Sequence, residues 1–270
     1  MIGVFDSGFG GFTVLSAFLD RLPQYDYLYL GDTARAPYGN HDKATILEYT
    51  REGVEFLFSQ GASLVILACN TASSNALREL QEELIRKPGV KDKNILGVVI
   101  PIAEEVGRLK KKELALIGTR ATVGSGVYQK EIEKHLKGFH LEQVACPLLV
   151  PLIEEGWAHS METKRILKDY LRPLKFRNPE LLIPACTHYP ILQKEMQQVM
   201  GKRTLVLKTG EVVAKSLEDY LKRHPDMEKR LEKKGSRKFM STDDAEKFKE
   251  ISRHFFKHPL GEVQRIHLPS

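Results

Sequence analysis

The sequence predicts an α/β fold made of two pseudo-symmetric α/β domains with mostly parallel sheets. Short apolar runs rich in branched residues alternate with helix-length segments, which is the pattern of parallel strands joined by helices. Two of these runs end in a cysteine followed by polar residues, at Cys69 and Cys186. The polar turn Asp6-Ser7 after the first run has a counterpart at Thr119-Arg120, at a similar spacing along the chain. These matched positions indicate an internal repeat.

The first half of the chain alternates strands and helices. Its expected strands are apolar runs at residues 1–5, 25–30, 64–68 and 94–100, the last ended by Pro101. Helices are expected at about 13–22, 42–60, 74–85 and 104–109. Gly8, Gly10 and Gly11 lie between the first strand and its helix, where backbone N–H groups can approach an anionic ligand.

The second half repeats this alternation. Strands are expected at residues 114–118, 140–145, 181–185 and 204–207, and helices at about 126–136, 160–175, 191–200 and 212–221. Beyond residue 221 the sequence is charged, with one late strand signal at 263–268. If the two halves face each other, their strand ends line one cleft, which is where open α/β sheets bind ligands.

Composition narrows the class of protein. The 270 residues are 42% hydrophobic and 28% charged, as in ordinary globular proteins. No apolar run reaches the roughly 18 residues of a membrane helix, and the first residues do not resemble a signal peptide, so we expect a cytoplasmic protein that binds no membrane. The net charge of +6 lies largely at 110–112 and 222–238, where it is typical of solvated helix faces, so nucleic-acid binding is not expected.

The cysteines carry the prediction of chemistry. Three cysteines in such a chain are expected to be reduced, and no Cys-x-x-Cys spacing predicts a metal site. A buried cysteine is usually a small apolar residue, which is how we interpret Cys146. Cys69 and Cys186 differ, because each precedes hydrogen-bonding residues and a helix N-terminus that can stabilise a thiolate. Two acid/base groups on opposite sides of a carbon are suited to racemisation or epimerisation.

Polar residues near the strand ends can supply the rest of such a site. A carbanion next to a carboxylate needs hydrogen-bond donors, and the candidates are Asn70, Thr71, Thr119, Thr122 and Thr187. Asp6 and His188 are candidates to assist the thiols. Each also has an ordinary structural interpretation, as a helix cap and as a buried histidine.

An ordered set of motifs resembles one family over nearly the whole chain. The motifs are Asp6-Ser7-Gly8 with Gly10-Gly11, Gly31-Asp32, Pro37-Tyr38-Gly39, Cys69-Asn70-Thr71-Ala72-Ser73, Gly118-Thr119 with Thr122-Val123, Val150-Pro151-Leu152-Ile153-Glu154 and Cys186-Thr187-His188-Tyr189-Pro190. Together they resemble the bacterial glutamate racemases of the cofactor-independent aspartate/glutamate racemase superfamily. The resemblance implies interconversion of L- and D-glutamate without cofactor or metal, supplying D-glutamate for peptidoglycan synthesis.

The resemblance also implies roles and boundaries. Cys69 and Cys186 are the two acid/bases, Asp6 assists the first thiol, and Glu154 and His188 assist the second. The implied substrate-binding residues are Asp6, Ser7, Pro37, Tyr38, Gly39, Asn70, Thr71, Thr119, Thr122, Thr187 and His188. The implied domains are 1–96 with 208–270, and 97–207, with the active site between them. A homodimer is implied as well.

Three alternatives stay open at this point. The first is a racemase of the same superfamily that acts on aspartate. The second is a cysteine hydrolase using Cys186 with His188, which leaves Cys69 unexplained and pairs residues whose closeness in sequence rarely gives a productive geometry. The third is a two-lobed binding protein in which both thiols only pack.

Overall fold

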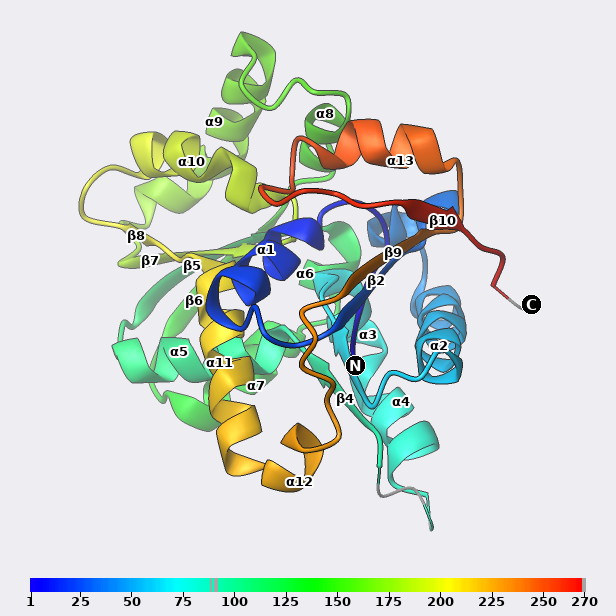
Figure 1. Cartoon of the computed structure of the whole chain (residues 1–270). Coiled ribbons are helices and arrows are strands. Elements are labelled where there is room, and N and C mark those ends of the chain that lie inside the picture. The colour runs from blue at the N-terminus through cyan, green and yellow to red at the C-terminus, as the bar shows by residue number, and fades with distance from the viewer. Residues whose placement is uncertain (88, 90–91, 269–270) are drawn as a thin grey trace.

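Two parallel sheets form the framework of the molecule (Figure 1). The computed structural model describes residues 1–87, 89 and 92–268. The larger sheet has six strands in the order β10 (Val263–Arg265), β9 (Arg237–Ser241), β2 (Tyr27–Gly31), β1 (Ile2–Asp6), β3 (Leu64–Leu67) and β4 (Asn94–Gly97). The smaller sheet has four, in the order β6 (His140–Ala145), β5 (Glu113–Gly118), β7 (Leu181–Ala185) and β8 (Leu205–Val206).

The two sheets share one connectivity. Every strand pairing in them is parallel. The order β2-β1-β3-β4 in the six-stranded sheet repeats as β6-β5-β7-β8 in the four-stranded sheet. The predicted fold of two related α/β halves is therefore confirmed. Only the six-stranded sheet is extended further, by β9 and β10 from late in the chain.

Helices cover the sheets. The helices of the first half, and of the later segment that returns to the six-stranded sheet, are α1 (Phe12–Arg21), η1 (Thr33–Arg35), η2 (Tyr38–Asn40), α2 (Lys43–Ser59), α3 (Asn70–Asn75), α4 (Leu77–Leu80), η3 (Gln81–Ile85), α11 (Thr209–Arg223), α12 (Pro225–Glu228) and α13 (Ala245–Ser252). In the second half they are α5 (Val99–Leu109), α6 (Arg120–Gly124), α7 (Val127–His135), α8 (Leu149–Glu154), α9 (Met161–Phe176), η4 (Tyr189–Leu192) and α10 (Gln193–Met200).

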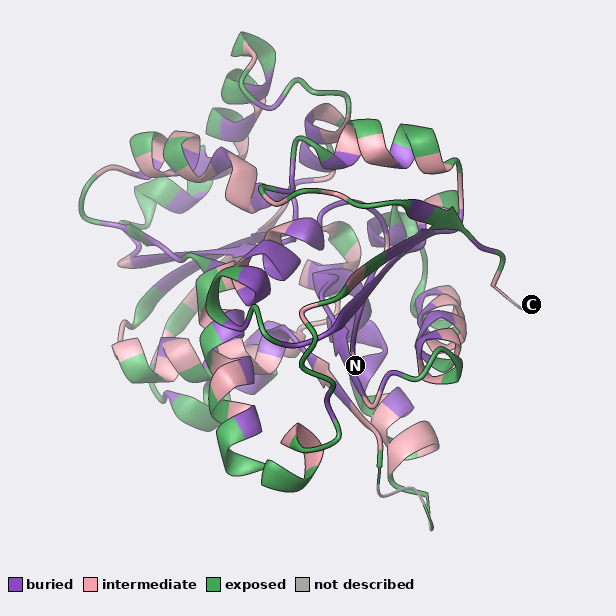
Figure 2. Cartoon of the chain, viewed as in Figure 1, coloured by how far each residue is buried: buried purple, intermediate pink, exposed green. Residues whose placement is uncertain are grey.

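Alternation along the strands divides the core. In β1, Val4 belongs to a cluster with α1, α5 and α11, whereas its neighbour Phe5 packs with α2 on the other face. The central strands are buried on both faces and the helices are exposed only on their outer sides (Figure 2). This is the reason that the strands are nearly continuous apolar runs in the sequence.

The structure differs from the sequence predictions at several boundaries. The strand expected at 94–100 ends at Gly97, and α5 begins at Val99 with Pro101 in its first turn, where the missing N–H is not needed. The helix expected at 74–85 begins earlier, at Asn70, and is broken into α3, α4 and η3. Strand β9 and helix α13 lie in the segment that we expected to be mainly a charged tail.

The chain crosses between the sheets after β4 and again after β8, and α11 packs against both α1 and α5 at this junction (Figure 1). Within residues 1–87, 89 and 92–268, no helix combines the length and the apolar character needed to cross a bilayer.

Candidate functional site

Both strand-end cysteines open onto one small cavity between the sheets. Cys69 follows β3 and Cys186 follows β7, which occupy equivalent places in the two sheets. The cavity has a volume of about 20 Å³. Its lining residues come from both halves: Ser7, Gly8, Ala36, Pro37, Tyr38, Gly39, Cys69, Asn70, Thr71, Thr119, Val150, Glu154, Cys186, Thr187 and His188. Of the residues singled out from sequence, only Asp6 and Thr122 lie just behind this lining.

The nearest partners of Cys69 are polar, and among the residues that the structure describes no positively charged side chain lies at hydrogen-bond distance from it. Cys69 is the N-cap of α3, and its Sγ accepts the N–H of Ala72 at 3.5 Å. The hydroxyl of Ser7 lies 3.3 Å from the same sulfur. Burial, and then the charge of Asp6, raise the pKa of Cys69 to about 12. The Cys69 side chain is therefore a thiol at neutral pH.

The surroundings of Cys186 contain an ion pair. The Nδ1 of His188 lies 3.8 Å from the Cys186 sulfur, and its Nε2 lies 2.7 Å from Oε1 of Glu154 on α8. Burial opposes charge on this imidazole, but the hydrogen bonds to Cys186 and Glu154 outweigh it and raise the pKa of His188 to about 10. His188 is therefore a positively charged imidazolium beside the Cys186 sulfur at neutral pH.

Asp6 lies between the two sides of the site. Its Oδ2 accepts the N–H of Gly8 at 3.0 Å, and the hydroxyl of Thr187 donates to its Oδ1 at 3.4 Å. Complete burial raises the pKa of Asp6, while the charge of His188 and the N–H groups of Gly11 and Gly8 oppose this. The loop after the first strand therefore places a carboxyl group at the boundary with the second half.

Three threonine hydroxyls meet beside the cavity. Thr71 on α3 lies 2.9 Å from the hydroxyl of Thr119 and 3.3 Å from that of Thr122, and the last two are 3.0 Å apart. Thr119 also caps α6 by accepting the N–H of Thr122 at 3.1 Å. Hydroxyl groups from both halves are thus gathered at one place, where they can donate hydrogen bonds to an anionic group.

Two further residues contact side chains that line the cavity and were not singled out as site candidates. Asp32, at the end of β2, accepts the Tyr38 hydroxyl and also Nε of Arg35 at 2.7 Å. Its place at the end of a strand, in the Gly31-Asp32 motif, is the signal that could have identified it. Tyr128 on α7 donates to Oδ1 of Asn70 at 2.5 Å. Nothing in the helical pattern around Tyr128 distinguishes it from an ordinary core residue.

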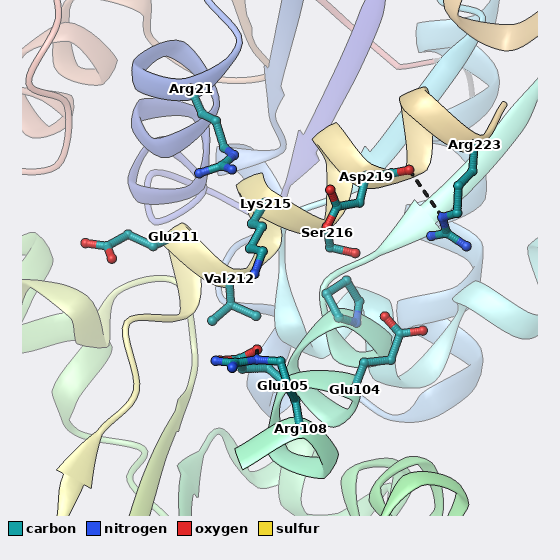
Figure 3. A pocket seen from close by; sticks show the side chains of 11 residues that line it. Arg21, Glu104, Glu105, Arg108, Glu211, Val212, Lys215, Ser216, Asp219 and Arg223 are labelled. Carbon is teal, nitrogen blue, oxygen red and sulfur yellow. Dashed lines mark hydrogen bonds and ion pairs between the residues drawn. The ribbon is translucent and has the colours of Figure 1, made fainter. Parts of the chain in front are cut away.

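A larger groove of about 380 Å³ lies elsewhere, between α1, α5 and α11 (Figure 3). Its charged lining is balanced, with basic Arg21, Arg108, Lys215 and Arg223 and acidic Glu104, Glu105, Glu211 and Asp219. Part of this charge is already paired, for example Arg108 with Glu105. None of the described residues that line the groove is a cysteine or histidine, so we place the candidate site at the smaller cavity. In the described part of the chain, no cluster of three His, Cys, Asp or Glu side chains is arranged to hold a metal ion.

Comparisons with known proteins agree on the family. A sequence model described as Asp/Glu/Hydantoin racemase matches residues 16–217. The chain is 38% identical to a glutamate racemase of Paracoccus denitrificans over 96% of this chain and 97% of the relative, and 41% identical to one of Aquifex aeolicus over 82% and 83%. The solved glutamate racemase of Francisella tularensis, in complex with D-glutamate, has a TM-score of 0.88 at 30% identity over 99% and 97% of the two chains. The chain therefore belongs to the Asp/Glu/Hydantoin racemase family.

Proposed function

We propose that this protein interconverts L- and D-glutamate without a cofactor, using Cys69 and Cys186 as the two acid/base groups. The observation that carries the proposal is that both sulfurs line one cavity, from equivalent strand ends of two facing sheets. Such an arrangement is suited to proton transfer on opposite faces of a single carbon. The relatives named glutamate racemase support glutamate as the substrate, in preference to aspartate.

The proposed reaction consists of two proton transfers. One cysteine, as thiolate, removes the proton from Cα, and the electron pair moves into the adjacent carboxylate. The other cysteine, as thiol, returns a proton to the opposite face and becomes the thiolate. Asn70, Thr71 and Thr119 line the cavity, and their amide and hydroxyl groups would donate to the carboxylate as its charge grows. The reverse reaction exchanges the two sulfurs.

The two sides would be charged differently at the start. Cys69 would begin as a thiol, with Asp6 and Ser7 beside it. The imidazolium of His188 can hold or release a proton at Cys186, with Glu154 fixing the ring. The α-ammonium of the substrate would add a positive charge near Asp6 and so favour the ionised forms of Asp6 and Cys69.

Substrate entry requires the halves to separate. A cavity of about 20 Å³ holds one or two water molecules but not glutamate. We take residues 1–96 with 208–270, and 97–207, as the two units that move apart, since each contains one of the sheets. Hydrogen exchange measured with and without D-glutamate tests this, and protection should rise on both sides of the cavity, in 36–39 and 119–122.

The product and the setting follow from the same proposal. D-glutamate would supply peptidoglycan synthesis, and the reaction belongs in the cytoplasm, where the thiols stay reduced. We also propose a homodimer, supported by the exposed apolar side chains of Trp157 and Met161, which are 55% and 77% accessible and close in sequence. Light scattering at several concentrations tests the dimer.

The decisive experiment is incubation of L-glutamate with the purified protein in deuterium oxide and no added cofactor. We expect D-glutamate to form with deuterium at Cα. Turnover of aspartate with inert glutamate would assign the protein to the aspartate branch instead. Loss of substrate without its mirror form would indicate a hydrolase, and no change in either substrate would indicate a binding protein.

A further inference from the structure

Tyr128 joins the two halves at a residue next to the first thiol. It lies in the first turn of α7, in the second half, and its hydroxyl donates to Oδ1 of Asn70 at 2.5 Å. Asn70 belongs to the first half, as the first residue of α3 directly after Cys69, and it lines the cavity. Tyr128 is 1% exposed and is not among the lining residues. Its ring is therefore part of the core, but its hydroxyl reaches a group of the site.

This hydrogen bond occupies one end of the Asn70 amide. Oδ1 accepts from Tyr128, which leaves Nδ2 as the other polar atom of the side chain. In the described part of the chain, no protein atom accepts a hydrogen bond from that Nδ2. Burial raises the pKa of the Tyr128 phenol, so the hydroxyl keeps its proton and acts as the donor to Asn70 at neutral pH.

The geometry points to Tyr128 as a positioning residue that fixes the Asn70 amide with its NH₂ group directed to the substrate carboxylate. An amide can face a ligand with either end, and only the NH₂ end donates to an anion. If Oδ1 faced the carboxylate instead, two acceptors would meet in a buried site. This inference rests on the proposed function, because it requires a substrate that bears a carboxylate.

A different explanation is that the Tyr128–Asn70 contact only holds α7 against the first half. A second contact made by α7 distinguishes the two explanations. One turn after Tyr128, Glu131 accepts from Arg78 of α4 at 3.1 Å, which is a second contact across the halves. Arg78 does not line the cavity, so its removal should not affect the orientation of the Asn70 amide. Loss of docking would follow from removal of either contact, whereas loss of amide orientation would follow only from Tyr128.

The test compares five variants of the full chain. Tyr128→Phe removes the hydroxyl and keeps the ring, and Tyr27→Phe is its matched control, because Tyr27 is equally buried but donates to the backbone oxygen of Leu22 at 3.0 Å. Arg78→Ala tests docking, and Asn70→Ala, alone and combined with Tyr128→Phe, completes a double-mutant cycle. The measurements are KM and kcat in both directions, and the affinity for D-glutamate by calorimetry.

We expect Tyr128→Phe to raise KM and the dissociation constant of D-glutamate about tenfold, with a smaller change in kcat. Tyr27→Phe and Arg78→Ala should leave both constants unchanged, and Tyr128→Phe should add nothing once Asn70 is alanine. Equal effects of Tyr128→Phe and Arg78→Ala, or a further loss in the Asn70→Ala background, would overturn the inference. Wild-type turnover tests the proposed function separately, because the calorimetric comparison requires no reaction. A wild-type protein that binds no glutamate would overturn both.

Discussion

The Cys69 side and the Cys186 side of the cavity share a backbone frame but differ in their charges. Each sulfur follows the equivalent strand of its sheet, β3 in one and β7 in the other. Cys69 has a hydroxyl and a backbone N–H as its nearest partners, whereas Cys186 has an imidazole backed by a carboxylate. The comparison teaches that a repeated fold has positioned two similar thiols, while different side chains surround each of them.

The first way to break this comparison is to remove each sulfur. We expect Cys69→Ser and Cys186→Ser each to lower kcat for racemisation on the order of 10³-fold, because a serine hydroxyl is a far weaker base. Chiral chromatography of the product measures it. Cys146→Ser is the control, since Cys146 is buried outside the cavity lining, and it should retain turnover. Full activity of either site variant would show that one sulfur is enough.

The next test disturbs each side separately by adding a methyl group to a glycine that lies against it. A Cβ at Gly10 would collide with the side chains of Thr187 and His188, so Gly10→Ala should displace the Cys186 side and lower kcat about 10²-fold. At Gly11 a Cβ would lie 2.6 Å from Cβ of Asp6, so Gly11→Ala should disturb the Cys69 side. Gly124→Ala meets no atom within 4 Å and should leave kcat unchanged. Kinetics of the three variants, with circular dichroism to check folding, decide the matter.

Glu154→Gln sharpens the comparison further. It keeps the size of the side chain but removes the charge that stabilises the His188 imidazolium, so we expect kcat/KM to fall about tenfold. Because the enantiomers have equal free energy in water, kcat/KM must fall equally in both directions. The asymmetry should appear in the isotope effect of α-deuterated substrate, which should grow only in the direction in which Cys186 removes the proton. Equal growth in both directions would contradict separate roles for the two sides.

The smallest effect concerns stability. The pKa of His188 is raised from an ordinary value of 6.5 to about 10, so its protonated form is favoured in the folded state. The contribution of protonated His188 to the free energy of unfolding is complete below pH 6.5 and is lost as the pH rises toward about 10. We therefore expect wild type to lose unfolding free energy relative to His188→Asn as the pH rises over that range. Urea titrations of both proteins at several pH values measure the difference, and parallel curves would argue against a charged His188.

Sequence patterns predicted the cysteines at the strand ends better than the buried residues that hold the lining side chains in position. Cys69 and Cys186 stand out because a short apolar strand determines where its polar end residue lies. Tyr128 does not stand out, since its partner Asn70 is distant in the chain and a buried tyrosine in an amphipathic helix has the pattern of a core residue. Strand β9 was missed for another reason: Phe239 and Met240 are its only apolar residues, and pairing with β2 rather than local propensity makes it a strand.

The position of β9 beside β2 has a consequence for the order of folding. The outer edge of β2 is covered only by residues 237–241, which are synthesised after the whole four-stranded sheet. The middle of the chain can therefore reach its native structure on the ribosome while the earliest residues still wait for their last neighbour. We therefore expect the N-terminal unit to complete its sheet last, which reverses the usual order in which the N-terminal unit folds first.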